Sequence, residues 1–271
     1  MVGRVVGEAR IWCKIGDVKI FEGQKFEIGS CAGREVVLDG EMAKIVILTG
    51  AGISAESGVK TFRDDGGLWE GHRVEEVATP EAFERDPVLV HQFYNQRRRD
   101  LKMVEPNAAH LALAQLAAGS GNEVSLITQN VDDLHERGGS AEVVHMHGQL
   151  LKKKCQWCGL RSGCEEDLSQ ADLCDACGRG GGMRPDIVWF GEMPYELAKI
   201  EGLLFEADIF VAIGTSGAVY PAGNFVNLAK VAGACTLEFN LERTGVSSSF
   251  DEVRLGKAGE LVPRWVGEVI E

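Results

Sequence analysis

The stretch Leu-Thr-Gly-Ala-Gly-Ile-Ser-Ala-Glu-Ser-Gly-Val-Lys-Thr-Phe-Arg occupies residues 48–63 and is the most informative part of the chain. It overlaps the end of an apolar run, Ile45–Leu48, that is typical of a buried strand. Gly50, Gly52 and Gly58 allow the backbone to bend sharply and to approach a pyrophosphate, whose charge suits the free N–H groups of a following helix. Because the spacing differs from the G-x-G-x-x-G of ordinary dehydrogenases and a polar loop follows at once, the stretch predicts a dinucleotide site that does not serve hydride transfer.

Apolar strands and helical segments alternate from residue 42 onward. Thr79-Pro80 and Asp86-Pro87 each predict a helix N-cap with proline in the first turn, and Asn107 predicts a third helix start. This alternation predicts a parallel sheet covered on both faces, which is a doubly wound α/β fold. The expected strands are Ile45–Leu48, Val124–Thr128, Val143–His145, Ile209–Ile213 and Thr236–Phe239.

The composition excludes several classes of protein. The chain has 271 residues, 45% of them hydrophobic, which suffices for a full core. It shows neither an apolar run long enough to cross a bilayer nor a secretory signal at its N-terminus. A net charge of −13 disfavours nonspecific binding to nucleic acid or anionic membranes. We therefore expect neither nucleic-acid nor membrane partners. Eight cysteines, four of them in paired spacing, suit metal ligation in a reducing compartment, so we expect a cytoplasmic protein.

Two Cys-x-x-Cys pairs, Cys155 with Cys158 and Cys174 with Cys177, predict a metal site. Two such knuckles, here separated by 15 residues, form a closed tetrahedral cage of four thiolates that is typical of Zn²⁺. A closed cage leaves no position for water or substrate, so the single zinc ion is expected to be structural. Cys164 lies between the pairs without a partner at the same spacing, and we interpret it as a thiol that does not bind the metal.

Residues 1–41 differ from the rest of the chain. They contain seven glycines and two β-like runs, Val18–Phe21 and Lys25–Ile28, and they are too short for a core of their own. Two interpretations stay open: a β-rich extension packed on the main domain, or a start assigned upstream of Met42.

The glycine-rich stretch is accompanied by blocks that together resemble the sirtuins, which are NAD-consuming protein deacylases. Thr-Gln-Asn-Val-Asp at 128–132, His-Met-His-Gly at 145–148, the cysteine pairs and Gly-Thr-Ser at 214–216 follow in the order of that family. The resemblance covers roughly residues 44–265. It implies a Rossmann-like NAD-binding domain and a small domain made of a helical module and the zinc ribbon. The expected boundaries are 42–62, 107–151 and 183–271 for the NAD domain, and 63–106 and 152–182 for the small domain.

The resemblance implies that NAD binds at the carboxyl ends of the parallel strands. It places Gln129 and Asn130 at the ribose, and Ser54 with Asp132 at the nicotinamide, although Asn and Asp at such positions are also typical helix caps. Phe62 would belong to a mobile loop over the cofactor. The full set of expected NAD contacts is Gly50, Ala51, Gly52, Ile53, Ser54, Glu56, Thr61, Phe62, Arg63, Trp69, Gln129, Asn130, Asp132, Gly214, Thr215, Ser216, Asn240, Leu241, Glu242 and Ala258.

By the same resemblance His147 is the expected general base, and Asn130 is the second expected catalytic residue. His145 is a rival, because alternation along a strand places both rings on one face. The implied reaction begins when the carbonyl oxygen of an acyl-lysine attacks the ribose carbon of NAD as nicotinamide leaves. His147 then takes a proton from a ribose hydroxyl, which attacks the imidate carbon. The acyl group ends on ADP-ribose, and the lysine is released.

Tyr94-Asn95-Gln96-Arg97 resembles the sirtuin subclass that removes acidic acyl groups. Tyr94 and Arg97 share a face of the predicted helix. Arg97 would bind a distal carboxylate, Tyr94 would add a hydroxyl donor, and Ala78 would leave room. A surface arginine beside a partly buried tyrosine is the plainer interpretation without the resemblance. With it, we expect removal of both acetyl and succinyl groups.

Val188-Trp189-Phe190-Gly191 resembles the sirtuin segment that pairs with substrate peptides as an added strand. An ordinary strand between domains is the alternative. For the activity, a mono-ADP-ribosyltransferase is the main alternative because it shares the first chemical step. The glycine spacing disfavours a dehydrogenase, and His147 beside the polar set disfavours a noncatalytic sensor. The expected partners are proteins with acylated lysines, and a monomer is favoured.

Overall fold

The structure is a computed structural model that describes residues 42–60 and 71–270 in full, together with the backbone of five short strands before residue 42. Those strands are β1 (Val5–Val6), β2 (Ala9–Arg10), β3 (Trp12–Cys13), β4 (Phe26–Cys31) and β5 (Arg34–Leu38). They form an antiparallel pair, β1-β2, and an antiparallel sheet with the order β3-β5-β4. β4 overlaps the expected run Lys25–Ile28. The expected run Val18–Phe21 and the expected NAD contacts Thr61, Phe62, Arg63 and Trp69 lie outside the described residues.

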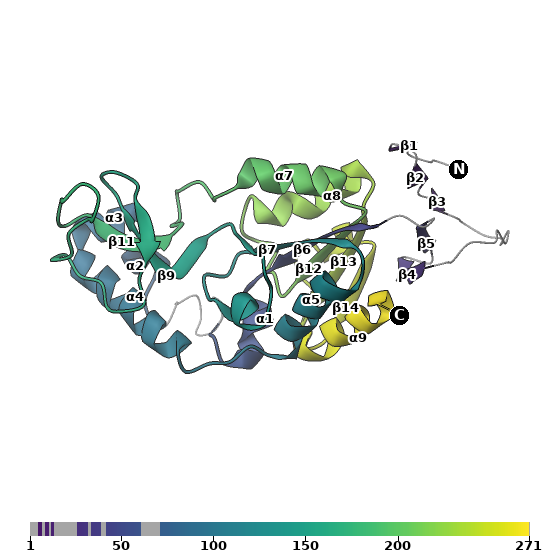
Figure 1. The fold of residues 1–271 in the computed structure, drawn as a ribbon, viewed down its shortest axis with the longest axis horizontal. Coiled ribbons are helices and arrows are strands. Elements are labelled where there is room, and N and C mark those ends of the chain that lie inside the picture. Colours follow the sequence, from purple (N-terminus) through teal and green to yellow (C-terminus); the bar gives the residue numbers. More distant parts are fainter. Residues whose placement is uncertain are drawn as a thin grey trace.

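A six-stranded parallel sheet forms the centre of the molecule (Figure 1). Its order is β14-β13-β12-β6-β7-β8. The chain therefore runs outward from β6 in one direction through β7 and β8, and later in the other direction through β12, β13 and β14. Ligands of open α/β sheets bind at the carboxyl ends of the strands where this order reverses, which here is between β6 and β12. The strands are β6 (Lys44–Thr49), β7 (Glu123–Thr128), β8 (Val144–His145), β12 (Ile209–Ile213), β13 (Cys235–Asn240) and β14 (Glu252–Leu255).

Helices cover both faces of this sheet because its strands carry apolar side chains on both faces. Ile45 and Ile47 pack with α5 (Ala108–Gly119) and α9 (Ala258–Ile270) on one face. Val46 and Leu48 pack with α7 (Leu197–Glu206) and α8 (Phe225–Ala232) on the other. Figure 1 shows the two layers on opposite sides of the strands. The predicted doubly wound α/β fold is confirmed, although β14 had no counterpart among the expected strands.

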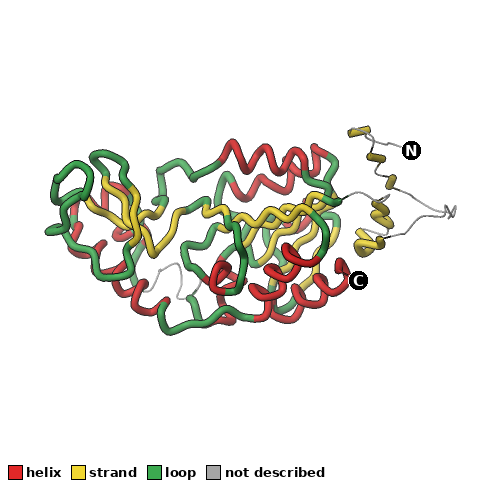
Figure 2. Tube along the Cα trace, in the orientation of Figure 1, coloured by secondary structure: helices red, strands yellow, loops and turns green. Residues whose placement is uncertain are grey.

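A smaller lobe lies at one end of the elongated molecule (Figure 2). It contains a three-stranded antiparallel sheet with the order β10-β9-β11, and three helices that pack beside it. Its elements are α2 (Val74–Val77), α3 (Pro80–Arg85), α4 (Pro87–Leu101), β9 (Gly148–Cys155), β10 (Arg161–Gly163) and β11 (Met183–Ile187). The short elements left are α1 (Ala51–Ser54), η1 (Ala55–Ser57), α6 (Leu134–Arg137), η2 (Ala222–Asn224) and η3 (Ser247–Ser249).

The three predicted helix starts are confirmed by their cap hydrogen bonds. The Thr79 hydroxyl accepts from the backbone N–H of Ala82, and the Asp86 carboxylate accepts from that of Leu89. The Asn107 side chain caps α5 in the same way. No helix in the described part of the chain combines the length and the apolar character needed to cross a bilayer.

Candidate active site

The glycine-rich turn after β6 packs directly on the end of β12, at the point where the strand order reverses. The Gly52 N–H donates to the Gly214 carbonyl at 2.9 Å, and the Gly50 N–H donates to the Ile213 carbonyl at 3.0 Å. A Cβ atom on Gly52 would lie 2.6 Å from the Gly214 Cα, and one on Gly50 would lie 2.8 Å from the Gly214 oxygen. Only glycines allow this backbone contact, so the sequence brings two loops together as a cradle that suits a pyrophosphate.

Several of the expected NAD contacts lie beside this cradle. Asn240, at the end of β13, donates from Nδ2 to the Thr215 carbonyl at 2.6 Å, which joins two of the predicted blocks. Glu56, another expected NAD contact, accepts a hydrogen bond of 2.8 Å from the Gly259 N–H. Gly259 follows Ala258, the first residue of α9. The Glu56 carboxylate is therefore engaged by the protein itself. Leu241 and Glu242 are exposed, and their contacts with NAD stay predictions.

Ser54 is the centre of a buried hydrogen-bond network at the carboxyl ends of β6 and β7. Its hydroxyl donates to Asp132 Oδ2 at 3.1 Å and accepts from Asn130 Nδ2 at 3.1 Å. His110 Nδ1 accepts from the Asn107 N–H, so the ring proton lies on Nε2, which donates to the Ser54 oxygen at 3.5 Å. Burial raises the pKa of Asp132 to about 6. The structure thus brings together three of the predicted site residues, and His110 joins them.

A second buried layer of polar side chains supports this network and was not predicted. The Thr49 hydroxyl donates to the Thr128 hydroxyl at 2.8 Å and must therefore accept the bond of 2.9 Å from His135 Nε2. The rings of His110 and His135 lie 4.9 Å apart. Burial lowers the pKa of His110 to about 4 and that of His135 to about 3, so both rings are neutral near pH 7. The sequence does contain a signal for the role of His110 at the start of α5. His110 stands three residues after the Asn107 cap, at the position where a capping box usually has Glu or Gln.

His147 and His145 have different environments, because His147 lies in the turn after β8 and not on the strand itself. β8 ends at His145, so strand alternation does not apply to His147. His145 is buried, with Nε2 bonded to Glu136 at 2.6 Å and Nδ1 at 3.3 Å from the Asn130 carbonyl. His147 is only partly buried, and its Nδ1–H donates to the Gln129 carbonyl at 3.1 Å.

The Gln129 contact fixes the His147 tautomer and leaves the lone pair on Nε2. Burial lowers the pKa of His147, so the ring is neutral near pH 7. Of the two histidines, only His147 is arranged to accept a proton from a bound molecule, because both nitrogens of His145 are engaged within the protein.

Tyr94 and Arg97 lie on one face of α4, as expected. Tyr94 is buried in the core of the small lobe, and its hydroxyl accepts a hydrogen bond of 2.9 Å from Trp189 Nε1. It is therefore more buried than the plainer interpretation allowed. The Arg97 guanidinium carbon lies 4.4 Å from the centre of the Phe93 ring, and the Arg97 side chain is 15% exposed.

The segment Val188–Gly191 connects the histidine region with this face of α4. The Val188 N–H donates to the His147 carbonyl at 2.8 Å, and the Phe190 N–H donates to the Ala78 carbonyl at 3.0 Å. The three expected parts of a substrate site, the base, the acyl-binding residues and the peptide-pairing segment, are therefore contiguous.

The four paired cysteines converge on one point at the end of the small lobe. Their sulfur atoms all lie within 4.8 Å of one another, with Cys155 Sγ 3.8 Å from Cys177 Sγ and Cys158 Sγ 3.5 Å from Cys174 Sγ. A tetrahedral zinc ion with Zn–S bonds of about 2.3 Å requires sulfur atoms about 3.8 Å apart. The set fits one structural Zn²⁺ ion, and Cys164 is not among the four.

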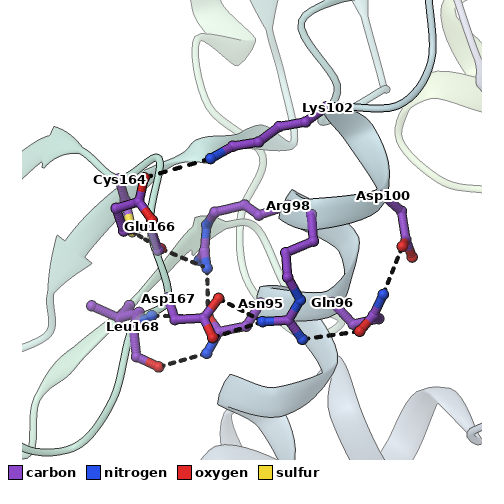
Figure 3. A network of polar contacts seen from close by, with 10 residues as sticks. Asn95, Gln96, Arg98, Asp100, Lys102, Cys164, Glu166, Asp167 and Leu168 are labelled. Carbon is purple, nitrogen blue, oxygen red and sulfur yellow. Dashed lines mark hydrogen bonds and ion pairs between the residues drawn. The ribbon is translucent and has the colours of Figure 1, made fainter.

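The zinc ribbon is joined to α4 by Asn95 and Arg98 (Figure 3). Asn95 exchanges two hydrogen bonds of 2.9 Å with the backbone of Leu168. Arg98 is 1% exposed, donates from Nε to the Leu150 carbonyl at 2.9 Å, and reaches the Glu166 carbonyl with Nη1 at 3.4 Å. The sequence shows Arg98 only as part of a basic run, so its role in holding the ribbon was missed.

Comparison with known proteins agrees with this geometry. The sequence profile described as "Sir2 family" matches residues 50–221. A protein of Vibrio parahaemolyticus named NAD-dependent protein deacylase is 56% identical over 228 residues, which cover 83% of this chain and 95% of the relative. A Yersinia pseudotuberculosis protein of the same name is 53% identical over 241 residues, covering 88% of this chain and 87% of the relative.

Solved structures show the same likeness. A Sir2 homologue in complex with NAD has a TM-score of 0.77 and 41% identity, covering 83% of this chain and 88% of its own. A Sir2 protein bound to an acetylated peptide has a TM-score of 0.71 and 29% identity, covering 84% of this chain and 94% of its own. The chain belongs to the Sir2 family. The predicted enzyme class, NAD-dependent protein deacylase, is confirmed, as are NAD and one structural zinc as its cofactors.

Proposed function

We propose that this deacylase removes both succinyl and acetyl groups from lysine side chains, and that Arg97, Tyr94 and Ala78 bind the acidic acyl group. The observation that carries the proposal is the continuity of α4 with the segment Val188–Gly191 and with His147. A succinyl group adds a carboxylate at its far end, and an arginine with a neighbouring hydroxyl suits that carboxylate.

Arg97 is well placed for this role because its position is restricted while part of its surface stays exposed. Its guanidinium lies over the Phe93 ring, and Arg97 Nη2 lies 3.7 Å from Asp100 Oδ2. A substrate carboxylate could bind such a guanidinium in bidentate geometry. Burial raises the pKa of Tyr94, so its hydroxyl keeps its proton near pH 7 and can donate it.

The proposed chemistry assigns the proton transfer to His147. NAD supplies the electrophilic ribose carbon and the leaving nicotinamide, and it is consumed. His147 accepts a ribose hydroxyl proton at Nε2, while the Gln129 carbonyl holds the ring through Nδ1. Asn130 and Ser54 bind and orient the cofactor near Asp132. The products are nicotinamide, O-acyl-ADP-ribose and free lysine.

Several finer assignments remain part of this proposal. They are the individual NAD contacts predicted above, the pairing of Val188–Gly191 with the substrate peptide, and the division into two domains. A cytoplasmic location and a monomeric state stay predictions. A mono-ADP-ribosyltransferase, the alternative reaction, would leave ADP-ribose attached to the target protein.

The test compares one lysine peptide carrying either a succinyl or an acetyl group, with and without NAD, by measuring released nicotinamide and deacylated peptide. We expect NAD-dependent turnover of both peptides and a ratio of one nicotinamide per lysine freed. Arg97→Met should lower kcat/KM for the succinyl peptide at least about tenfold more than for the acetyl peptide. Arg99→Met is the matched control, because Arg99 lies on the same helix but pairs with exposed Asp167 in the ribbon. Equal losses on both peptides in Arg97→Met would refute the acyl-binding role, and ADP-ribose retained on the peptide would favour the alternative.

A further inference from the structure

The Thr49 hydroxyl joins both ends of the loop that carries several polar residues of the site. This loop, residues 129–133, follows Thr128 at the end of β7 and ends where α6 begins. Thr49 is the last residue of β6 and lies opposite Thr128 in the parallel pairing of the two strands. Its hydroxyl donates to the Thr128 hydroxyl at 2.8 Å and accepts from His135 Nε2, in α6, at 2.9 Å. One side chain on β6 therefore holds the loop on both sides.

The first two residues of the loop are held by the same pair of threonines. The Gln129 N–H donates to the Thr49 carbonyl at 2.9 Å, and the Asn130 N–H donates to the Thr128 hydroxyl at 3.0 Å. These bonds fix two groups on which the proposed chemistry depends. The Gln129 carbonyl accepts from His147 Nδ1, and the Asn130 side chain belongs to the hydrogen-bond network that is proposed to orient the cofactor.

Stability alone does not account for this arrangement. Thr49, Thr128 and His135 are all buried, and His135 Nδ1 has no hydrogen-bond partner within the described residues. Burial of an unpaired polar nitrogen costs free energy, and apolar side chains of similar size would avoid that cost. A buried chain of hydrogen bonds rigidifies its surroundings and favours one arrangement of the groups attached to it. Here those groups are the backbone of the loop that carries Gln129 and Asn130.

We propose that Thr49 is a positioning residue for the deacylation reaction, because its hydroxyl holds the loop 129–133 in the place that His147 and the cofactor require. The inference rests on the proposed roles of His147 and Asn130. His135 contributes by donating to the Thr49 oxygen, which directs the Thr49 proton to Thr128. The Thr49 side chain is fully buried, so it acts through the loop and does not touch the substrate.

The test removes the Thr49 hydroxyl and keeps the shape of the side chain. Thr49→Val leaves the backbone bond to Gln129 in place, so it isolates the effect of the hydroxyl. We expect kcat/KM for NAD to fall about tenfold or more, because a misplacement of about 1 Å at a reaction site is enough for such a loss. Thr49→Ser keeps the hydroxyl and should stay within about threefold of the wild-type value. Nicotinamide release is measured on whichever of the acetyl and succinyl peptides the wild-type protein turns over faster, so the result does not depend on the acyl preference.

Thr236→Val is the matched control. Thr236 is 0% exposed, as Thr49 is, and it also lies in a strand of the central sheet. Its hydroxyl also makes two hydrogen bonds, to the Asp251 carboxylate at 2.8 Å and from the Asp251 N–H at 3.0 Å. Thr236→Val should therefore lower the melting temperature at least as much as Thr49→Val, because one of its partners is charged. It should leave kcat/KM as it is, because Thr236 lies near the start of β13 and the site lies at the carboxyl ends of the strands.

A double-mutant cycle tests whether the two threonines act as one unit. Thr128→Val removes the group that links Thr49 to the Asn130 N–H. In the Thr128→Val background, Thr49→Val should cause no further fall in kcat/KM, because the acceptor of its proton is already gone.

The outcomes separate this inference from the proposed function. If His147→Ala or Asn130→Ala retains most of the wild-type kcat/KM, the proposed roles fail and the role of Thr49 fails with them. If both of these variants are impaired but Thr49→Val keeps its activity as Thr236→Val does, only the role of Thr49 is overturned. The same holds if Thr49→Ser loses as much activity as Thr49→Val, or if the effects of Thr49→Val and Thr128→Val are additive.

Discussion

Replacing Gly52 with alanine should damage the NAD site through a backbone collision. The added Cβ would lie 2.6 Å from the Gly214 Cα and 2.9 Å from its carbonyl oxygen. Ordinary contacts begin near 3.4 Å, so the end of β12 and the turn after β6 have to separate by roughly 0.8 Å. The three atoms nearest to the added Cβ all belong to the backbone of Gly214, so the movement cannot be absorbed by the end of a flexible side chain.

Two effects follow from this displacement. Overpacking of this kind costs about 1–3 kcal/mol of unfolding free energy, which lowers the melting temperature of a chain of this size by about 2–10 °C. A misplacement near 1 Å at a binding site costs up to about 100-fold in activity, so we expect the KM for NAD to rise about tenfold or more. Nicotinamide release measured against NAD concentration, with thermal unfolding in parallel, tests both.

Gly202→Ala is the matched control. Gly202 lies in the exposed part of α7, and an added Cβ would meet no atom within 4 Å. Alanine there should raise the unfolding free energy by about 0.5–1 kcal/mol and leave the KM for NAD as it is. If Gly52→Ala behaved like this control in both measurements, the close contact of the two loops would not be needed for NAD binding.

Three further predictions concern the metal and the histidines. Cys174→Ser should abolish the bound zinc measured by elemental analysis, whereas Cys164→Ser should retain one ion per chain; loss in both would make Cys164 a ligand. Burial holds the pKa of His110 near about 4 and that of His135 near about 3, so between these values and pH 6.5 the unfolded chain binds protons that the folded chain does not. The free energy of unfolding should therefore fall as the pH drops below 6.5, by about 1.4 kcal/mol per pH unit for each ring. His110→Gln keeps the helix cap and removes one of the two rings, so chemical denaturation should show a smaller dependence of the unfolding free energy on pH. An unchanged dependence would contradict the assignment. Since burial lowers the pKa of His147, kcat/KM for deacylation should decline only at a pH below the ordinary histidine value of about 6.5, and a decline centred above it would argue against His147 as the base.

The parts of the fold that were predictable depend on local rules. Alternating apolar residues such as Ile45 and Val46 face opposite helical layers, so the central strands could be located from the sequence. The caps at Thr79 and Asp86 mark helix starts because a side-chain oxygen binds an N–H three residues away. β14 was missed because its residues are only partly buried and carry charges, which hides the apolar signal at the sheet edge.

The parts of the site that were missed depend on contacts between distant segments. His135 meets Thr49 across 86 residues, and Trp189 meets Tyr94 across 95. No spacing rule links such pairs, since the sheet order and the helix packing must be known first. The choice between the two histidines was open for the same reason, because it depends on where β8 ends and on which carbonyl the ring of His147 meets.

The basic run Arg97–Arg99 shows how far apart the roles of neighbouring residues can be. Successive residues of a helix point about 100° apart, so the three side chains leave α4 in three directions. Arg97 lies over the Phe93 ring, Arg98 is buried against the zinc ribbon, and Arg99 pairs with a ribbon aspartate near the surface. A closed zinc site has no open position for a substrate. The ribbon that is built around the zinc site nevertheless holds α4 through Arg98. The metal therefore acts on Tyr94 and Arg97, two of the proposed acyl-binding residues, by fixing the helix that carries them.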